Sequence, residues 1–227
     1  MVPEDRSRFS IVFWDFDGTL IPFDSEQFLL ESLFLQPVRR SLRSLGARLF
    51  VYGDRHGWDP GLIKVIYGRC LRGIPFSALE GVCVRIAAHI SEADRAAIRA
   101  LAARVEMVLL SCGTADLSRG TLRAAGLADV FSRVEANRLT RRKGRIAGIE
   151  RRIYLPQTKV EIAASYGVSW ERVIAVGDGL TDLPLLDHAG LPVLIAAGAR
   201  ADRFAGRGYH VVPLLGEAIA LIAESVS

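Results

Sequence analysis

FWDFDGTLIPFD, residues 13–24, joins an apolar run to two closely spaced acids. The run, Ile11 to Trp14, stops abruptly at Asp15, and Asp17 follows two positions later. A short run of bulky apolar residues that ends at a Gly-containing loop is typical of a buried strand. Doubly wound sheets bind their ligands beyond the carboxyl ends of their strands. We therefore expect a buried first strand with both acids at its ligand-binding end.

Other segments repeat the strand pattern. The strongest are Ser10–Trp14, Val105–Leu110 and Val173–Val176, and weaker patterns cover Ala189–Ile195 and Tyr209–Val212. The strong segments lack a sustained polar alternation, which favours a parallel sheet covered on both faces. Helical patterns lie between them. This order predicts an α/β fold with a doubly wound, Rossmann-like parallel sheet.

The stretch from 21 to about 90 differs, because it has helical spacing and no convincing strand pattern. We expect an α-helical insert there, between two parts of one α/β core at 1–20 and 91–227. One apolar face in the insert is formed by Val38, Leu42, Leu45 and Leu49, with arginines largely opposite. A basic amphipathic helix of this kind can lie on an anionic membrane. We instead expect the insert to bury this face.

Composition narrows the class of protein. Half of the 227 residues are hydrophobic and 24% are charged, which is typical of a packed domain. No apolar run approaches the roughly 18 residues that cross a bilayer, and the N-terminus lacks a signal peptide's apolar region. We expect a cytoplasmic protein without stable membrane insertion. The chain has only three cysteines, and such a small, odd number argues against a disulfide framework.

Polar residues follow all three strong strands. The first ends in Asp15 and Asp17, the second in Ser111, Cys112 and Gly113, and the third in a loop with Asp178 and Asp182. Any one of these could be an ordinary turn. When all three loops lie at the same edge of the sheet, their carboxylates come close together and repel each other unless a cation binds them. Carboxylate oxygens are ligands that suit Mg²⁺. The glycines and Ser111 suit a phosphate, because exposed backbone N–H groups bind anions.

These motifs carry a family resemblance. DFDGTL, LLSCG, Lys159 and GDGLTD resemble, in order and context, the four motifs of the haloacid dehalogenase-like phosphohydrolases. GDGLTDLPLL is similar to the phosphoserine-phosphatase-like branch, and the helical insert lies where that superfamily carries its first type of cap. The resemblance covers nearly the whole chain. It implies an α/β core with an inserted helical cap domain.

The resemblance also implies a role for each residue. Asp15 would be the nucleophile that forms an aspartyl-phosphate, and Asp17 would protonate the leaving alcohol and then activate water. Mg²⁺ would be held by Asp15, the Asp17 backbone carbonyl and Asp178, and Asp182 would support the metal site or orient Lys159. The phosphate-binding residues would be Ser111, Cys112, Gly113 and Lys159, with Cys112 a small filler.

These roles predict an enzyme. We expect Mg²⁺-dependent hydrolysis of a small phosphomonoester, because Asp17 supplies the proton that a departing alkoxide needs and a halide does not. A phosphotransferase that uses the same aspartyl-phosphate is an alternative. A non-catalytic module that binds a phosphorylated metabolite is another. A third alternative makes Cys112 the nucleophile, but six residues separate Cys112 from Arg119, one more than that type of loop requires.

Two further stretches concern partners. Asp24, Arg69 and Arg72 are candidates for recognising the leaving group, and Tyr67 lies near the position where a phosphoserine phosphatase carries its arginine. The basic stretch from 138 to 152 lacks interleaved aromatic residues. We expect it to be a solvated hairpin or loop rather than a nucleic-acid interface.

Overall fold

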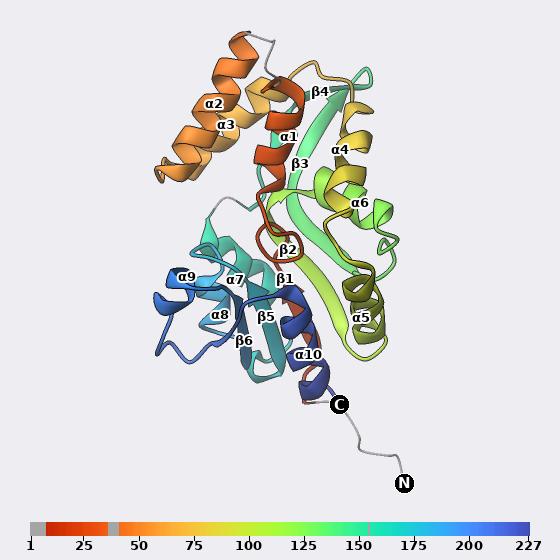
Figure 1. Cartoon of the computed structure of the whole chain (residues 1–227), viewed down its shortest axis with the longest axis vertical. Helices are drawn as coiled ribbons and strands as arrows, with labels where there is room; N and C mark the ends of the chain where they lie inside the picture. The colour runs from red at the N-terminus through yellow and green to blue at the C-terminus, as the bar shows by residue number, and fades with distance from the viewer. Residues whose placement is uncertain (1–7, 36–40, 154) are drawn as a thin grey trace.

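The computed structural model describes residues 8–35, 41–153 and 155–227. A seven-stranded sheet with the order β4-β3-β2-β1-β5-β6-β7 runs through it (Figure 1). The strands are β1 (Ile11–Trp14), β2 (Glu106–Thr114), β3 (Arg133–Arg142), β4 (Arg145–Glu150), β5 (Val173–Gly177), β6 (Leu191–Ile195) and β7 (His210–Val212). Neighbouring strands are parallel except β3 and β4. The predicted α/β doubly wound sheet is confirmed.

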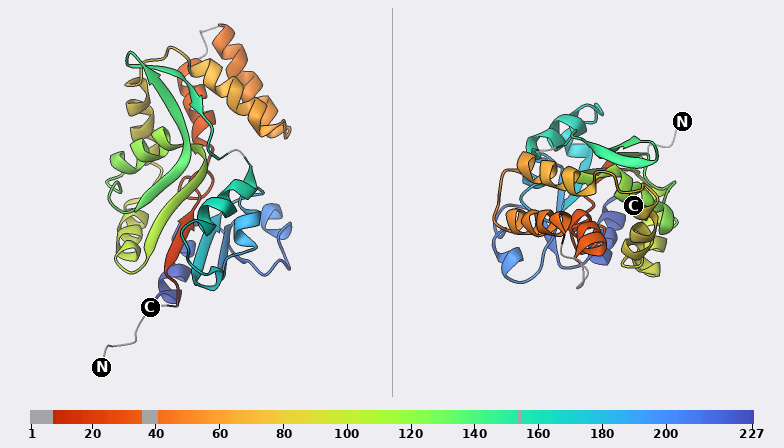
Figure 2. Two further views of the ribbon diagram at one scale, coloured as in Figure 1. Left: turned by 180° about the vertical axis from the view of Figure 1, so that it is seen from behind. Right: turned by 90° about the horizontal axis from the view of Figure 1, so that it is seen from above.

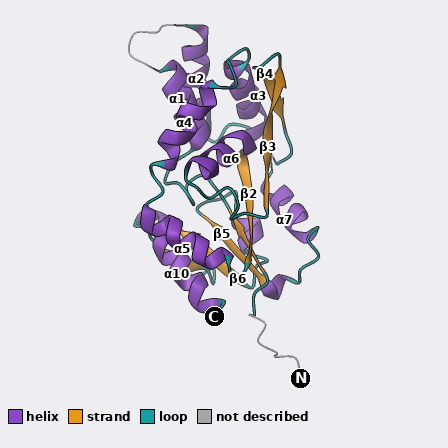
Figure 3. Ribbon diagram, turned by 90° about the vertical axis from the view of Figure 1, so that its right-hand side faces the viewer, coloured by secondary structure: helices purple, strands orange, loops and turns teal. Residues whose placement is uncertain are grey.

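Helices cover both faces of this sheet. They are α1 (Ser25–Phe34), α2 (Leu42–Arg55), α3 (Pro60–Leu71), α4 (Ala78–Ala87), α5 (Glu92–Ala102), α6 (Ala115–Ala124), α7 (Pro156–Ala164), α8 (Leu183–Leu186), α9 (Ala199–Asp202) and α10 (Leu215–Ser225). Figure 3 shows α5 and α10 together on one side of the sheet and α7 on the other. No helix among the described residues is both long and apolar enough to cross a membrane.

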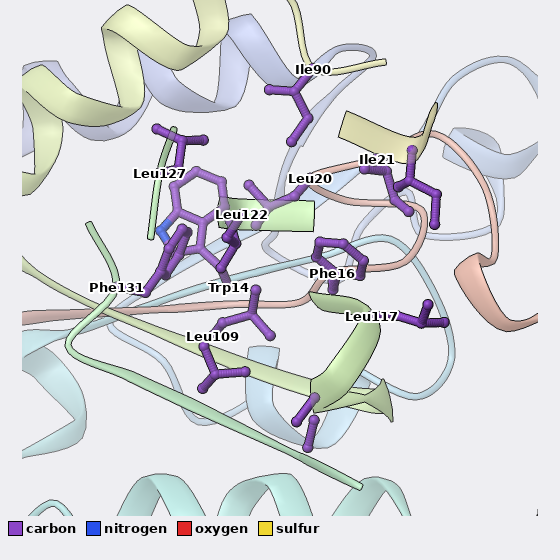
Figure 4. Close-up of a cluster of buried hydrophobic side chains, with 14 of the residues drawn as sticks. Trp14, Phe16, Leu20, Ile21, Ile90, Leu109, Leu117, Leu122, Leu127 and Phe131 are labelled. Carbon is purple, nitrogen blue, oxygen red and sulfur yellow. The ribbon is translucent and has the colours of Figure 1, made fainter. Parts of the chain in front are cut away.

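Strand β1 lies in the middle of the sheet and is buried throughout. Val12 and Trp14 face one apolar core, and Ile11 and Phe13 face the other. This alternation follows from the two-residue period of a strand, and it explains why both faces of the run are apolar. Figure 4 shows Trp14 within the first core, among residues that include Leu109 and Leu122.

The pair β3–β4 was not among the predicted strands. Its sequence alternates arginine with apolar residues, so that Leu139 and Ile146 are buried while Arg138 and Arg141 are exposed. The basic stretch, predicted to be a hairpin or loop, lies within this antiparallel hairpin. Pairing with β2 on one side makes β3 part of the main sheet, a long-range contact that local pattern does not reveal.

The insert predicted at 21–90 contains the helices α1 to α4 in its described part, and no named strand occurs there. Helices α2 and α3 pack together, whereas α4 packs against α6 beside the sheet (Figure 2). The boundaries at 20 and 90 stay a prediction. The hairpin reaches this segment, because the backbone of Gly73, Ile74 and Phe76 bonds to Gly144 and Ile146 at 2.7–2.9 Å.

The expectation that the insert buries its apolar face is wrong for α2. Leu42, Leu45 and Leu49 are 89%, 56% and 41% exposed, and Val38 lies outside the described residues. The helix instead packs through Ala47 and Phe50, which are buried. Small residues such as Ala47 let neighbouring helices approach closely, so the face that packs is not the most apolar one.

Candidate active site

The carboxyl ends of β1, β2 and β5 bring the predicted site residues together. Asp15 directly follows β1, and its N–H donates to the Val176 carbonyl at 2.9 Å, so sheet bonding continues to the acid itself. Ser111 and Gly113 lie at the end of β2. Asp178 lies directly after β5. Lys159 enters from α7, which begins at a proline, a residue preorganised for a first helical turn.

Lys159 holds two of the acids. Its Nζ lies 2.8 Å from Asp15 Oδ1 and 2.6 Å from Asp182 Oδ1, and its side chain is 1% exposed. Burial alone would lower the pKa of Lys159, but the two carboxylates raise that pKa well above its ordinary value. The ammonium is therefore charged at neutral pH and fixes the position of Asp15.

Asp182 organises the loop after β5. Its Oδ2 accepts the backbone N–H groups of Asp178 and Gly179 at 3.0 and 3.2 Å, while its Oδ1 accepts from Lys159. Both carboxylate oxygens are thus engaged by the chain, and the side chain is 3% exposed. Of the roles predicted for Asp182, this geometry favours orienting Lys159 and shaping the loop that carries Asp178.

The acids form a group that a cation fits. One carboxylate oxygen from each of Asp15, Asp178 and Asp182 lies within 4.8 Å of the others. Burial raises the pKa of Asp15 to about 7 and that of Asp178 to about 6. Burying the charged forms of Asp15 and Asp178 costs free energy. A divalent cation reduces this cost, because it neutralises the carboxylates and replaces the water that they lose. The carboxylate of Asp17 is not part of this group, in keeping with its predicted contribution through the backbone carbonyl.

Asp17 has the environment of a proton donor. Burial, then the charges of Asp24 and Asp15, raise its pKa well above the ordinary value. Its Oδ1 accepts the Ser25 N–H at 2.7 Å, which fixes the carboxyl relative to α1. A raised pKa favours the protonated carboxyl, which is the form that can give a proton to a leaving group.

Gly18 lets two loops approach each other. Its φ is +71°, and a Cβ built there would lie 2.3 Å from Asp178 Oδ2. A side chain would therefore be strained in its backbone and would push the Asp178 carboxylate aside. The glycine of the DFDGTL motif is required because the first loop lies directly against the third.

The loop at the end of β2 is shaped for an anion. The Gly113 N–H donates to Ser111 Oγ at 3.0 Å, and both residues line the cavity. Cys112 lines it too, but burial raises the pKa of its thiol. A nucleophilic cysteine needs a depressed pKa, so the thiol's environment favours the reading of Cys112 as a filler.

Asn137 secures this loop and was not predicted. Its Nδ2 donates to the carbonyls of Cys112 and Ile153 at 2.7 and 2.8 Å, and its Oδ1 accepts from Arg152 and Ile153 at 2.7 and 2.9 Å. The wholly buried side chain ties β3 to the phosphate loop and to the segment before α7. Nothing in its local sequence, VEANRL, distinguishes it from a surface asparagine.

A cavity of about 470 Å³ opens above these residues. From the core it is lined by Asp15, Asp17, Gly18, Ser111, Cys112, Gly113, Ile153, Pro156, Asp178, Thr181 and Arg200. From the helical segment it is lined by Pro22, Phe23, Asp24, Glu26, Phe50, Asp54, Trp58, Pro60, Ile63 and Lys64. The helical segment therefore covers the candidate active site.

The three candidates for leaving-group recognition fall in different places. Asp24 lines the cavity and caps α1 through a 2.6 Å bond from Gln27 N–H. Arg69 and Arg72 are exposed and are not among the residues that line the cavity. Tyr67 is buried, with its hydroxyl 3.3 Å from Thr114 Oγ1. Helix α3 presents Lys64 rather than Arg69 to the cavity.

Sequence analysis missed Glu26, Asp54, Lys64 and Arg200 as cavity residues. Lys64 offered a signal, since it is one of three lysines in a chain with 26 arginines. Arg200 gave none, because it lies in the short helix α9 and does not directly follow a strand pattern. Its guanidinium lies 3.0 Å from Asp178 Oδ2 and also donates to the Ile195 carbonyl, so it partly neutralises Asp178.

Comparison with known proteins agrees with this geometry. The sequence profile of the haloacid dehalogenase-like hydrolases matches residues 12–187. The chain belongs to the haloacid dehalogenase-like hydrolases. The family membership predicted from the four motifs is thus confirmed.

Relatives within this family include phosphatases. A phosphoserine phosphatase of Archaeoglobus fulgidus is 32% identical over 134 residues, which cover 57% of this chain and 38% of that protein. A family hydrolase from Salmonella enterica serovar Typhi superimposes with a TM-score of 0.72 at 22% identity, over 97% of this chain and 72% of that one. A substrate-bound phosphoserine phosphatase gives 0.69 at 18% identity, over 94% and 97%. At these identities the structures show a shared fold.

Proposed function

We propose that this family member is a phosphatase that hydrolyses a small phosphomonoester through an aspartyl-phosphate on Asp15. The observation that supports it most is the contact of buried Lys159 with Asp15 at 2.8 Å, beside Asp178 and beneath a covered cavity. Fixed positive charge next to a carboxylate lets that anion approach a phosphate anion. The phosphatase relatives support the same reaction.

The reaction would proceed in two steps. A carboxylate oxygen of Asp15 forms a bond to phosphorus as the ester P–O bond breaks, and Asp17 gives its proton to the departing alkoxide. Asp17 then takes a proton from water, whose oxygen attacks the aspartyl-phosphate and releases inorganic phosphate with Asp15 restored. Ser111 and the Gly113 N–H hold the phosphoryl oxygens, and Lys159 balances the charge on both groups.

Mg²⁺ fits the acid group and is the cofactor that we propose. Asp15, Asp178 and the Asp17 backbone carbonyl would hold it, and when bound it would neutralise phosphate oxygens. The 4.8 Å span of the carboxylate oxygens and the raised pKa values of Asp15 and Asp178 support a cation there. The ion pair with Arg200 engages one Asp178 oxygen, Oδ2, and leaves the other carboxylate oxygen for the metal.

The segment at 21–90 is proposed as the cap that reads the leaving group. It supplies about half of the residues that line the cavity. A cavity of about 470 Å³ suits a small metabolite, since ligand pockets start at roughly 300 Å³. The names of the relatives suggest phosphoserine as one substrate to test.

Asp15→Asn tests the nucleophile. With Mg²⁺ and p-nitrophenyl phosphate, the variant should lose at least about 1,000-fold in turnover, because an amide cannot form the acyl-phosphate. Asp129→Asn is the matched control, since Asp129 is 79% exposed and lies outside the cavity. It should keep wild-type turnover and the same far-UV circular dichroism. Wild-type turnover in Asp15→Asn would refute the assignment.

A further inference from the structure

The cap side of the cavity carries an excess of negative charge. Among the described lining residues, the acids contributed there are Asp24, Glu26 and Asp54, and the single base is Lys64. The one other lining base, Arg200, lies on the core side against Asp178. A substrate's phosphate is held at the core, so these cap residues face the rest of the ester. Their charge therefore selects the leaving group.

The Lys64 ammonium is already paired with Glu26 and does not bind a substrate anion without breaking that ion pair. Its Nζ lies 2.5 Å from Glu26 Oε2, and the two side chains are 13% and 1% exposed. A buried pair of this kind is neutral as a unit, and separating it to bind a carboxylate would leave Glu26 buried and unpaired. The pair thus engages the one cation that the described part of the cap contributes to the cavity lining.

Glu26 also presents an unsatisfied acceptor. Its second oxygen, Oε1, is buried and has no hydrogen-bond partner among the described residues, and the residue lines the cavity. A buried acceptor without a donor is costly in free energy. A ligand that brings an N–H donor to this oxygen would remove the cost.

Asp24 and Asp54 add two further negative charges. Neither forms an ion pair within the part of the chain that the structure describes, and Asp24 accepts only the Gln27 N–H of its own helix cap. The acids are close enough to affect each other. After burial, the negative charge of Asp24 contributes to the raised pKa of both Glu26 and Asp54. This mutual repulsion disappears when a cation lies among them.

Aromatic rings line the same part of the cavity. Phe23, Phe50 and Trp58 line the cavity together with these acids, and aromatic faces attract alkylammonium groups. Acids together with aromatic rings form an environment that binds a positively charged nitrogen and its carbon substituents.

We propose that the substrate is the phosphate monoester of an amino alcohol, with a positively charged nitrogen and no carboxylate on the leaving group. This inference rests on the phosphatase activity proposed above. The ammonium would lie between Asp24, Asp54 and Glu26 Oε1. A carboxylate on the same carbon skeleton, as in phosphoserine, would meet these acids without a free cation to balance it.

Matched esters test the charge preference. The probes are O-phosphoethanolamine, 2-hydroxyethyl phosphate, which replaces the ammonium by a hydroxyl, and O-phosphoserine, which adds a carboxylate. With Mg²⁺, kcat/KM for phosphoethanolamine should exceed that of each other ester by about tenfold or more, because one well-placed ion pair in a partly buried site is worth that factor.

A cap variant ties this preference to the site. Asp54→Asn should lower the ratio of kcat/KM for phosphoethanolamine over 2-hydroxyethyl phosphate by roughly tenfold. Asp129→Asn removes the same charge outside the cavity and should leave the ratio unchanged. A ratio unchanged in Asp54→Asn would overturn the assignment of the ammonium to these acids.

The outcomes separate the two proposals. Hydrolysis of the neutral ester without a preference for the ammonium ester, or a preference for phosphoserine, overturns the substrate class and leaves the phosphatase proposal standing. Failure to hydrolyse any ester, p-nitrophenyl phosphate included, overturns the phosphatase proposal and this inference with it.

Discussion

Lys159 is the residue on which the stability of the acid group depends. It is completely buried and contacts two carboxylates that are themselves buried. Such an arrangement is stable only as a set, because removal of one partner leaves charge without compensation. The same ammonium is proposed to balance the phosphoryl group, so stability and activity depend on one side chain.

Lys159→Met should destabilise the metal-free protein by about 3 kcal/mol at neutral pH. The loss should be smaller at about pH 5, where Asp15, with its pKa of about 7, takes up a proton and no longer needs the cation. Urea unfolding in chelator measures both values. Lys143→Met is the control, since Lys143 is exposed in the hairpin turn and its replacement should cost under about 0.5 kcal/mol. Equal losses in the two variants would contradict the role of Lys159.

Asn137 gives a second prediction at this scale. Asn137→Leu removes four hydrogen bonds and leaves the Cys112 and Ile153 carbonyls and two N–H groups without their partner. We expect a loss of about 3 kcal/mol in unfolding free energy, since each unsatisfied buried group costs roughly 1–3 kcal/mol. Thermal and urea unfolding measure it. A variant as stable as wild type would show that these bonds are dispensable.

At the scale of the residue, sequence indicated a site only where a side chain follows a strand pattern. Asp15, Asp17, Ser111 and Asp178 were candidates because each comes directly after a buried apolar run. Asn137, Arg200 and Glu26 escaped notice because their roles come from contacts with distant segments. Arg69 was a candidate because it lies two residues from Tyr67, near the position where a phosphoserine phosphatase carries its arginine. That α3 presents Lys64 to the cavity instead depends on how the helix packs, which local sequence does not reveal.

At the scale of the element, the turn after β1 determines how closely the first and third loops approach. Gly18→Ala should weaken Mg²⁺ binding, because the new methyl group would displace Asp178 from 2.3 Å away. Gly167→Ala is a matched control, with φ +69° against +71° and no atom within 4 Å of its Cβ. Both variants should lose about 1 kcal/mol of stability from backbone strain. Only Gly18→Ala should raise the Mg²⁺ concentration needed for half-maximal activity; equal metal dependence in both would argue against the steric role.

Some helices and strands could be predicted from the sequence better than others. The central strands were found because burial on both faces makes them continuously apolar. The strands β3 and β4 were not predicted, because only one face of this arginine-rich pair is apolar and buried. The apolar face of α2 was recognised in the sequence, yet its leucines are exposed.

For the whole molecule, protonation and metal binding compete. Burial raises the pKa of Asp15 from 3.8 to about 7, of Asp178 from 3.8 to about 6 and of Glu26 from 4.5 to about 7. The folded chain therefore binds more protons than the unfolded chain between about pH 4 and 7, and these groups lose their stabilising effect as pH rises through that window.

We expect Mg²⁺ to raise the melting temperature more at about pH 7.5 than at about pH 5.5, because at the lower pH protons occupy the carboxylates that the cation needs. Scanning fluorimetry with and without the ion measures both shifts. Asp178→Asn should abolish most of the shift at the higher pH. Identical shifts at the two pH values would count against a cation held by these carboxylates.

The hydrogen bonds between the β3–β4 hairpin and the segment after α3 affect how a substrate can reach the cavity. Three backbone hydrogen bonds join residues 73–76 to 144–146, and a fourth bond runs from the Arg145 guanidinium to the Gly73 carbonyl. Lifting the helices straight off the sheet would break all four, whereas a swing about this edge keeps them. We therefore expect an incoming ester to enter away from this edge, past residues of the helical segment that line the cavity, such as Asp54 and Trp58. The substrate would then pass the acidic residues of the helical segment before its phosphate reaches Asp15.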